Sequence, residues 1–158
     1  MRIRVIAVGQ KPPAWVREAS QDYANRLAPE LRLEWTEVRP ETRGPSGHAL
    51  SWMAHEAVRI RAAIPPGATV VALDEHGDEL TSRDLAQRLN RWRDRSQPLA
   101  FVIGGADGLD GQFKREAHER IRLSSLTLPH AMVRVLLAEQ LFRAWSILNN
   151  HPYHRDGC

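Results

Sequence analysis

Apolar positions along the chain recur in two alternating rhythms, one typical of β-strands and the other of α-helices. The strand-like segments are residues 2–9, 31–38, 69–73, 99–103 and 121–126. The helix-like segments are residues 13–27, 49–63, 82–93, about 112–119 and 129–148. Strands that alternate with helices predict an α/β fold, with a mainly parallel sheet and helices on both faces. The loop 41–47 and the tail 149–158 are polar, and we expect the tail to be irregular.

Two of the expected strands are apolar throughout. Thr69–Leu73 reads TVVAL and Leu99–Ile103 reads LAFVI, and such runs are typical of strands covered on both faces. In open α/β sheets, ligands bind outside the carboxyl ends of the strands. Chemistry is therefore expected in three segments that follow predicted strands: Leu73-Asp74, Gly104–Gly108 and Leu123–Pro129.

Length and composition are those of an ordinary globular chain. The 158 residues suffice for one domain with a hydrophobic core, and 42% hydrophobic with 26% charged residues argues against disorder. The longest apolar stretches fall far short of the roughly 18 to 20 residues that a membrane span needs. Residues 1–5 lack the apolar region of a signal peptide, and Cys158 is the only cysteine, which excludes an intrachain disulfide. We expect a single domain over residues 1–158, cytoplasmic and without a membrane partner.

The basic residues are unusual in kind more than in number. The formal net charge is only +3, but of the 22 basic residues only Lys11 and Lys114 are lysines, so the other 20 are arginines. The planar guanidinium holds phosphate with two hydrogen bonds and stacks on bases, which suits RNA. A GC-rich genome that favours arginine codons explains the same excess. The charge alone does not establish a nucleic-acid partner.

Gly104–Gly108 reads GGADG and lies between a buried strand and a helix. Glycine allows the backbone to approach a ligand closely and permits positive φ. The spacing is neither G-x-G-x-x-G nor a phosphate-binding loop with its Lys-Ser/Thr pair, so it favours no dinucleotide or nucleoside triphosphate. Taken alone, these residues favour an ordinary strand-to-helix turn.

Leu123–Leu128 reads LSSLTL, in which apolar side chains interleave with small hydroxyls before Pro129 and His130 begin a helix. Such a segment could enclose a small apolar ligand while its backbone groups meet the polar edges of that ligand. The alternative is a buried strand whose hydroxyls bond to its own backbone.

The last helix and the tail carry the remaining chemistry. Glu139 and Arg143 are four residues apart and can pair on the helix surface, beside a broad apolar stripe that serves the core or a partner subunit. The tail 149–155 reads NNHPYHR, and these side chains can stack on bases, contact phosphate and move protons. His151, His154 and Cys158 supply at most three metal ligands without a zinc-like spacing, so no metal site is expected.

Nucleophilic catalysis has no signature in the sequence. No G-x-S-x-G motif occurs, and the only cysteine is the last residue.

Several of these segments together resemble one family, the RlmH family of small SPOUT-class methyltransferases of large-subunit ribosomal RNA. The residues that carry the resemblance are Val5–Gly9, Leu73-Asp74, Ile103–Leu109, Leu128–His130, Arg134–Leu136, Glu139–Leu141, Arg143-Ala144 and Pro152–Arg155. The resemblance covers essentially the whole chain and is most specific in the C-terminal third. Many relatives end at or near the histidine-basic pair, whereas this chain continues with Asp156-Gly157-Cys158.

The resemblance implies a fold and an activity that pattern alone does not give. It implies a SPOUT-type α/β domain with a C-terminal trefoil knot, whose knotted, cofactor-binding part spans about residues 69–158. Pattern reasoning would exclude a knot, because knots are very rare. It further implies a homodimer that uses S-adenosyl-L-methionine to methylate N3 of a pseudouridine. That base lies in the helix 69 loop of 23S rRNA, on the assembled 70S ribosome.

By motif match, the resemblance places the methyl donor against the three segments at the strand ends. The implied cofactor-binding residues are Leu73, Gly104, Gly105, Leu123, Ser124, Ser125, Leu126, Thr127 and Leu128.

Catalytic roles follow as hypotheses from the implied reaction. The N3–H of pseudouridine is a weak acid, so methylation needs a route for its proton and stabilisation of charge on the neighbouring carbonyl oxygens. Arg155 and Arg134 are candidates for holding that charge or the flanking phosphates. His154 is a candidate for orienting or accepting the proton, and Tyr153 for stacking on the base. We expect the tail to act in the same or the partner subunit.

Two other functions remain open at this point. A small nucleotide-binding or metabolite-binding α/β protein would use Gly104–Gly108 and prefer a nucleotide to S-adenosyl-L-methionine. A ribosome-associated factor without catalysis would bind ribosomes and transfer no methyl group.

Overall fold

The computed structural model describes residues 1–156. Its strands are β1 (Arg2–Val8), β2 (Arg32–Val38), β3 (Thr69–Glu79), β4 (Leu99–Ile103) and β5 (Glu119–Arg122). Its helices are α1 (Ala14–Arg26), α2 (Ala49–Ala63), α3 (Ser82–Asp94), α4 (Gly111–Glu116), α5 (His130–Leu148) and the 3-10 helix η1 (Pro152–Asp156). The predicted alternation of strands and helices is confirmed.

The strands form one parallel sheet in the order β2-β1-β4-β3-β5. β4 lies in the middle, where all five of its residues are buried, as its continuous apolar sequence predicts. The parallel arrangement sends the carboxyl ends of all five strands to one edge of the sheet.

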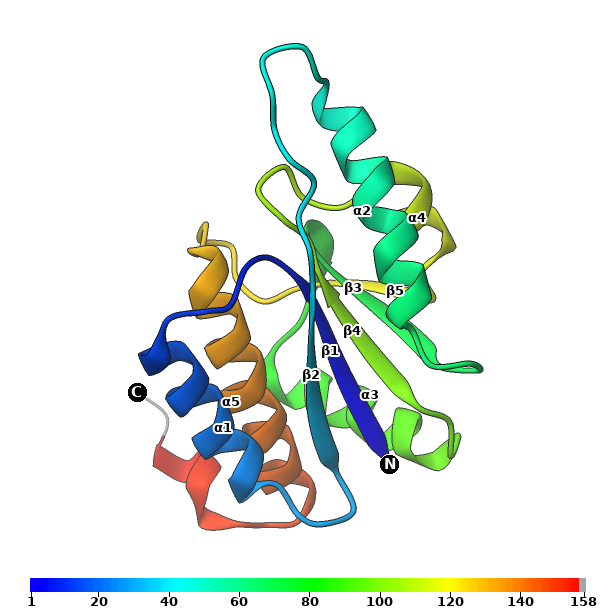
Figure 1. Cartoon of the computed structure of the whole chain (residues 1–158). Coiled ribbons are helices and arrows are strands. Elements are labelled where there is room, and N and C mark those ends of the chain that lie inside the picture. Colours follow the sequence, from blue (N-terminus) through cyan, green and yellow to red (C-terminus); the bar gives the residue numbers. More distant parts are fainter. Residues whose placement is uncertain (157–158) are drawn as a thin grey trace.

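Helices cover both faces of this sheet (Figure 1). On one face, α1, α3 and α5 contribute to a core that includes Phe101, Leu89 and Leu141. On the other face, α2 and α4 pack with Ile60 and Phe113 against alternate residues of the same strands. α5 contacts both α1 and α3, which accounts for its apolar residues on several sides. The predicted α/β class, with helices on both faces, is confirmed.

β3 continues well beyond the apolar run that predicted a strand over 69–73. Leu73 lies opposite Ile121 of β5, and after an irregularity Asp78 lies opposite the same residue. A Cβ on Gly77 would lie 2.7 Å from the backbone of Ile121, so this close approach requires glycine. The added residues are mostly polar, which hides the continuation from the hydrophobic pattern.

The predicted bounds around β5 are wrong by several residues. α4 ends at Glu116 rather than near Glu119, because the His118 N–H donates to the Val70 carbonyl at 3.0 Å and draws the chain toward β3. β5 therefore begins and ends early, at Glu119–Arg122 rather than 121–126. In consequence, Leu123–Leu128 lie outside the sheet and connect it to α5.

Residues 152–156 of the tail form a 3-10 helix, whereas the sequence predicted an irregular segment. The His151 N–H donates to the Ser146 carbonyl at 2.9 Å, and the Ser146 hydroxyl donates to the His151 carbonyl at 3.0 Å. These bonds turn the chain back onto α5, where Pro152–Asp156 form η1.

Candidate active site

The carboxyl ends of β4 and β5 lie on either side of Leu73, because both strands pair with β3. Leu73 lies in register with Ile103 on one side and with Ile121 on the other. Gly104 follows Ile103 directly, and Leu123 comes two residues after Ile121. The structure therefore brings the three sequence-predicted cofactor segments to one edge of the sheet.

Gly104–Gly108 forms a compact turn that leads from β4 toward α4. A Cβ on Gly104 would lie 2.6 Å from the backbone carbon of Gly108, so a larger residue does not fit without movement. Gly108 has a φ of +85°, and its N–H donates to the Gly105 carbonyl at 3.0 Å. Asp110 caps α4 with a side-chain hydrogen bond of 3.0 Å. The turn thus presents mainly backbone at the sheet edge.

Leu123–Leu128 form an exposed connection beside that turn. The Leu126 N–H donates to the Ser124 hydroxyl at 2.9 Å, and residues 125–127 are exposed. The Leu126 side chain is 77% exposed, which makes it one of the most exposed large apolar groups of the described residues. An exposed leucine among backbone polar groups fits a ligand with both an apolar surface and polar edges.

His130, the first residue of α5, faces the ends of β1 and β4. Its imidazole Cε1 lies 3.3 Å from where a Cβ on Gly9 would be, so the glycine leaves room for the ring. Desolvation by the surrounding protein lowers the pKa of His130, and the positive charge of Arg134 lowers it further. Hydrogen bonding with the backbone of Gly104 and Val8 opposes this shift. His130 is therefore a neutral imidazole at the site near pH 7.

His130 is not among the site residues that the sequence predicts, although it belongs to the Leu-Pro-His motif that carries part of the family resemblance. The available signal was its position at the start of the last helix, directly after a segment predicted to bind a ligand.

Arg134 lies one helical turn after His130 and is buried. Its Nη1 donates to Glu37 Oε1 of β2 at 2.9 Å, so the guanidinium is already paired within the chain. The structure thus places this predicted catalytic arginine at the correct end of α5, but with a carboxylate partner that competes for its charge.

The other predicted catalytic residues lie on the tail, against the later turns of α5. The Tyr153 ring centroid lies 4.6 Å from that of Phe142, and its hydroxyl donates to Glu139 Oε1 at 2.9 Å. The His154 N–H donates to the Ser146 hydroxyl at 3.2 Å, and its Nδ1 lies 2.9 Å from the same oxygen. Arg155 is exposed.

Glu139 organises the contacts of the tail. It pairs with Arg143 at 2.8 Å as the four-residue spacing predicts, but it is buried rather than on the surface. The same carboxylate accepts from Tyr153 and from the Gln140 amide. The Arg143 guanidinium also lies 5.0 Å from the centre of the Tyr153 ring.

Within one chain, η1 does not reach the predicted cofactor segments. Glu139 and Ser146 come 9 and 16 residues after His130 in the sequence. A helix rises about 1.5 Å per residue, so they lie roughly 14 and 24 Å farther along α5. Figure 1 shows the red segment that includes η1 at the opposite end of α5 from the sheet edge. The structure brings the predicted cofactor residues together and leaves Tyr153, His154 and Arg155 apart from them.

A groove lies next to Arg134, between α1, β2 and α5. It has a volume of about 190 Å³ and is lined in part by Val16, Ser20, Trp35 and Glu37. Trp35 Nε1 and Ser20 Oγ are buried and have no hydrogen-bond partner among the described residues. Such unpartnered polar atoms are unusual in a folded chain.

Neither a metal cluster nor a membrane-crossing helix is found within residues 1–156. No group of three or more histidine, cysteine, aspartate or glutamate side chains in this range could hold a metal ion. Cys158, one of the three metal ligands considered above, lies outside the described residues. None of the helices described has the length and apolar character needed to cross a membrane.

Comparison with known proteins identifies the family. A family model described as "Predicted SPOUT methyltransferase" matches residues 1–154. The ribosomal RNA large subunit methyltransferase H of Burkholderia thailandensis is 57% identical over 155 residues, which cover 98% of this chain and 99% of that protein. Its namesake in Ralstonia pickettii is 56% identical with the same coverage.

Solved structures agree on the fold. A probable methylase family protein from Haemophilus influenzae superposes with a TM-score of 0.62 at 17% identity, covering 95% of this chain and 69% of that one. A probable methyltransferase from Bordetella pertussis gives a TM-score of 0.57 at 20% identity, covering 90% and 95%. The full-length matches establish that this chain belongs to the SPOUT methyltransferase family, within the ribosomal RNA large subunit methyltransferase H group.

Proposed function

We propose that this protein transfers a methyl group from S-adenosyl-L-methionine to N3 of a pseudouridine in the helix 69 loop of 23S rRNA, on the assembled 70S ribosome. The observation that carries the proposal is the meeting of Leu73, the Gly104 turn and Leu123–Leu128 at one sheet edge of a SPOUT family member. Relatives that share more than half of its residues are named as methyltransferases of the large-subunit ribosomal RNA.

The residues at the sheet edge fit the proposed cofactor. The exposed side chain of Leu126 offers an apolar contact for a purine. The backbone of Leu123–Leu128 lies outside the sheet and can form hydrogen bonds with the polar edges of that purine. The turn from Gly104 to Gly108 offers a close backbone approach, because no Cβ intervenes at Gly104. When bound there, S-adenosyl-L-methionine would supply an electrophilic methyl group.

The tail would supply the groups that act on the base. The pseudouridine N3–H must lose its proton for the nitrogen lone pair to attack, and the resulting charge spreads onto the adjacent carbonyl oxygens. The exposed guanidinium of Arg155 can hold that charge or a flanking phosphate. His154 can orient or accept the proton, and Tyr153 can stack on the base.

The distance between the two parts of the site favours a homodimer. Because η1 of one chain lies at the far end of α5, we infer that its residues complete the site of a second copy. The groove at Arg134 supports this inference, since it holds two unpartnered polar atoms beside α1, on which the Trp15 side chain is 54% exposed. A two-fold arrangement would create two identical sites, each with residues from both chains.

We further propose a knotted chain path for this protein and a location in the cell. Residues 1–158 would form one domain in which the part from about 69 to 158 is threaded as a trefoil knot, as SPOUT membership implies. We propose that the site acts without a metal and, because ribosomes are the proposed substrate, that the protein is cytoplasmic.

The decisive test is transfer of tritiated methyl from S-adenosyl-L-methionine to 70S ribosomes, free 50S subunits and naked 23S rRNA. Label on the 70S RNA that maps to a pseudouridine in the helix 69 loop is expected. Cofactor binding without label on any of the three RNAs would mean a non-catalytic ribosome factor or another substrate. Preference for a nucleotide over S-adenosyl-L-methionine would favour the nucleotide-binding alternative.

The division of labour between the tail and the sheet edge has its own test. Arg155→Ala should slow turnover with cofactor saturating, and deletion of residues 153–158 should abolish methylation but spare cofactor binding. Unchanged turnover, or loss of cofactor binding in the truncated chain, contradicts the assignment.

Mixing two inactive variants tests the shared site directly. Gly104→Ala should block the cofactor site and deletion of residues 153–158 removes the tail groups, so random exchange of subunits restores one good site in half of the dimers. About a quarter of wild-type activity is expected. No recovery after verified subunit exchange would place both parts of the site in one chain.

A further inference from the structure

The connection between β2 and α2 projects beyond the sheet at the edge where the cofactor segments lie. Figure 1 shows this loop and the first turns of α2 standing above the ends of the strands. The loop is polar, and one of its arginines, Arg43, makes contacts to two other parts of the chain.

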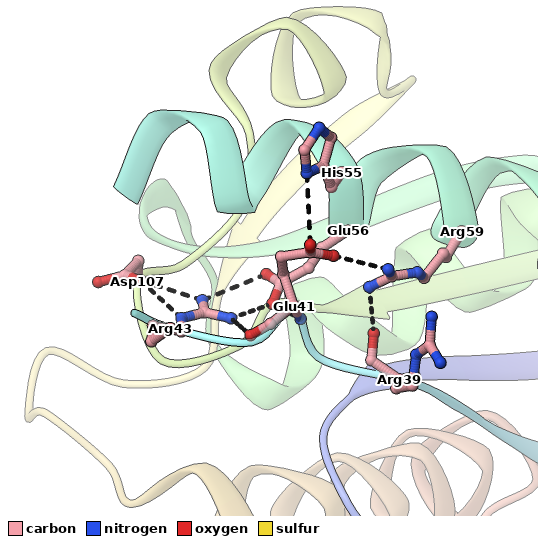
Figure 2. A network of polar contacts seen from close by, with 7 residues as sticks. All are labelled: Arg39, Glu41, Arg43, His55, Glu56, Arg59 and Asp107. Atoms are coloured by element: carbon pink, nitrogen blue, oxygen red, sulfur yellow. Dashed lines mark hydrogen bonds and ion pairs between the residues drawn. The ribbon is translucent and has the colours of Figure 1, made fainter. Parts of the chain in front are cut away.

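Arg43 joins the loop to a buried carboxylate on α2 (Figure 2). Its Nη1 donates to Glu56 Oε2, and also to the Glu41 carbonyl at 2.7 Å. The Glu56 side chain is only 2% exposed, and its carboxylate also accepts the Glu41 N–H at 2.9 Å. A buried carboxylate needs such partners, and hydrogen bonding to it raises the pKa of Arg43, against an opposing effect of burial.

The other side of the same guanidinium reaches the Gly104–Gly108 turn. Arg43 Nε and Nη2 donate to Asp107 Oδ2 at 3.2 and 3.0 Å. Glu56 also approaches this turn, because a Cβ on Gly105 would lie 3.3 Å from Glu56 Oε1. Two contacts therefore hold the turn. Glu56 packs against Gly105, and Arg43 pairs with Asp107.

We infer that Arg43 is a positioning residue that holds the Gly104–Gly108 turn in its cofactor-binding conformation by bridging Glu56 and Asp107. The inference rests on the proposed function, since it assumes that this turn receives S-adenosyl-L-methionine. The turn lies at the surface, with the Asp107 side chain 34% exposed, so the bridge removes freedom that cofactor binding would otherwise have to remove.

The bridge depends on the shape of the guanidinium. Arg43 uses one side of its planar fork for Glu56 and the other for Asp107. The compact ammonium of a lysine cannot reproduce that arrangement. The ring of Trp52 lies 5.4 Å from the guanidinium and further fixes it on α2.

Three variants test the inference. Asp107→Asn removes the charge at the tip of the turn, and Arg43→Lys keeps the charge but loses the fork. Glu41→Gln is the matched control, because the Glu41 side chain ties the same loop to Arg59 of α2 at 2.6 Å without touching the turn. The backbone contacts of Glu41 to Glu56 and Arg43 remain in that control.

The measurements are the dissociation constant for S-adenosyl-L-methionine by calorimetry, kcat and KM on 70S ribosomes, and hydrogen exchange at the Gly108 amide. Asp107→Asn and Arg43→Lys should each weaken cofactor binding by about tenfold, the factor typical of a lost charge-assisted hydrogen bond. KM for the cofactor should rise with kcat nearly unchanged, and the Gly108 amide should exchange faster until cofactor is added. A variant with both Asp107→Asn and Arg43→Lys should bind the cofactor no more weakly than Arg43→Lys alone.

Several outcomes would overturn the inference. Asp107→Asn with wild-type cofactor affinity would show that the bridge is only structural, even if the melting temperature fell. An equal loss in Glu41→Gln would assign the effect to the loop as a whole. A wild-type chain that bound the cofactor but methylated no ribosomal RNA would refute the proposed function alone, since the binding comparison still stands. A wild-type chain that bound no cofactor would refute both.

Discussion

The hydroxyl of Tyr153 donates a hydrogen bond to Oε1 of Glu139 at 2.9 Å and so fastens the tail to α5. Burial raises the pKa of Tyr153 above its ordinary value of 10.0, and hydrogen bonding with Tyr23 and Glu139 raises it further. Tyr153 is therefore a neutral phenol at physiological pH. It can stack or donate a hydrogen bond, but it does not serve as a base.

Tyr153→Phe should change how stability depends on alkaline pH. Because folding favours the neutral phenol, its contribution is fully present below the unfolded pKa near 10 and is lost as the pH rises toward the higher folded value. The free energy of unfolding of the wild type should therefore fall more steeply than that of Tyr153→Phe between about pH 9 and 11. Urea unfolding across this range measures both slopes, and equal slopes would show that the phenol is not their source.

His130→Asn should change how stability depends on acidic pH, where the wild type loses stability as the pH falls rather than as it rises. The pKa of His130 is lowered in the folded chain, so its contribution is present above the unfolded value near 6.5 and is lost as the pH falls through the folded pKa. The wild type should lose more stability than His130→Asn between about pH 7 and 5. His76→Asn, at an exposed position, is the control. An NMR titration that found His130 protonated at pH 7 would contradict the assignment.

Gly104→Ala should damage both the turn and the site. The added Cβ would lie 2.6 Å from the Gly108 backbone, so the turn must shift at a cost of about 1–3 kcal/mol in the free energy of unfolding. Gly44→Ala is the matched control, because nothing lies within 4 Å of its Cβ position, and it should change stability by less than about 0.5 kcal/mol. Thermal unfolding and cofactor calorimetry measure both effects. Wild-type cofactor affinity in Gly104→Ala would remove the turn from the site.

Ser146→Ala should release the tail while leaving the cofactor segments intact. The buried hydroxyl donates to the His151 carbonyl and accepts from the backbone N–H of His154. Its loss should lower the free energy of unfolding by about 1–3 kcal/mol. Ser82→Ala is the control, since that hydroxyl also bonds to α5, through Gln140, but does not touch the tail. Methylation should fall only in Ser146→Ala, with cofactor affinity unchanged. A tail equally resistant to protease in both variants would refute the role of Ser146.

The sequence pattern predicted the fold where burial dominates the choice of conformation. Leu99–Ile103 is apolar on both faces and is indeed the central strand, and Ala49–Ala63 is a helix with the predicted bounds. The pattern failed where contacts across the sheet override it. The polar end of β3 follows β5 around Gly77, and His118 leaves its helix to pair with Val70.

Part of the candidate site could be predicted from the sequence, because it depends only on the order of strands and their ends. Strand ends of a parallel sheet must meet, so Leu73, Gly104 and Leu123 could be grouped from the pattern alone. The bridge of Arg43 could not be predicted, because its partners lie 13 and 64 residues away in the sequence. Nor does periodicity indicate that η1 turns back onto α5, since the Ser146 hydroxyl that holds it belongs to an otherwise ordinary helix.

The central position of β4 also governs how the chain can fold as it is made. β4 is the fourth strand in the sequence, yet it supplies the neighbour that both β1 and β3 require. At about 5–20 residues per second, translation reaches Leu99 roughly 5 to 20 seconds after Ile3. During that interval β1 and β3 lack the strand that pairs with both of them. The edges that β4 will cover stay open to chaperones or to one another. A truncated product that ends before Leu99 therefore has no route to the native sheet, so completion of the fold waits for synthesis rather than following it strand by strand.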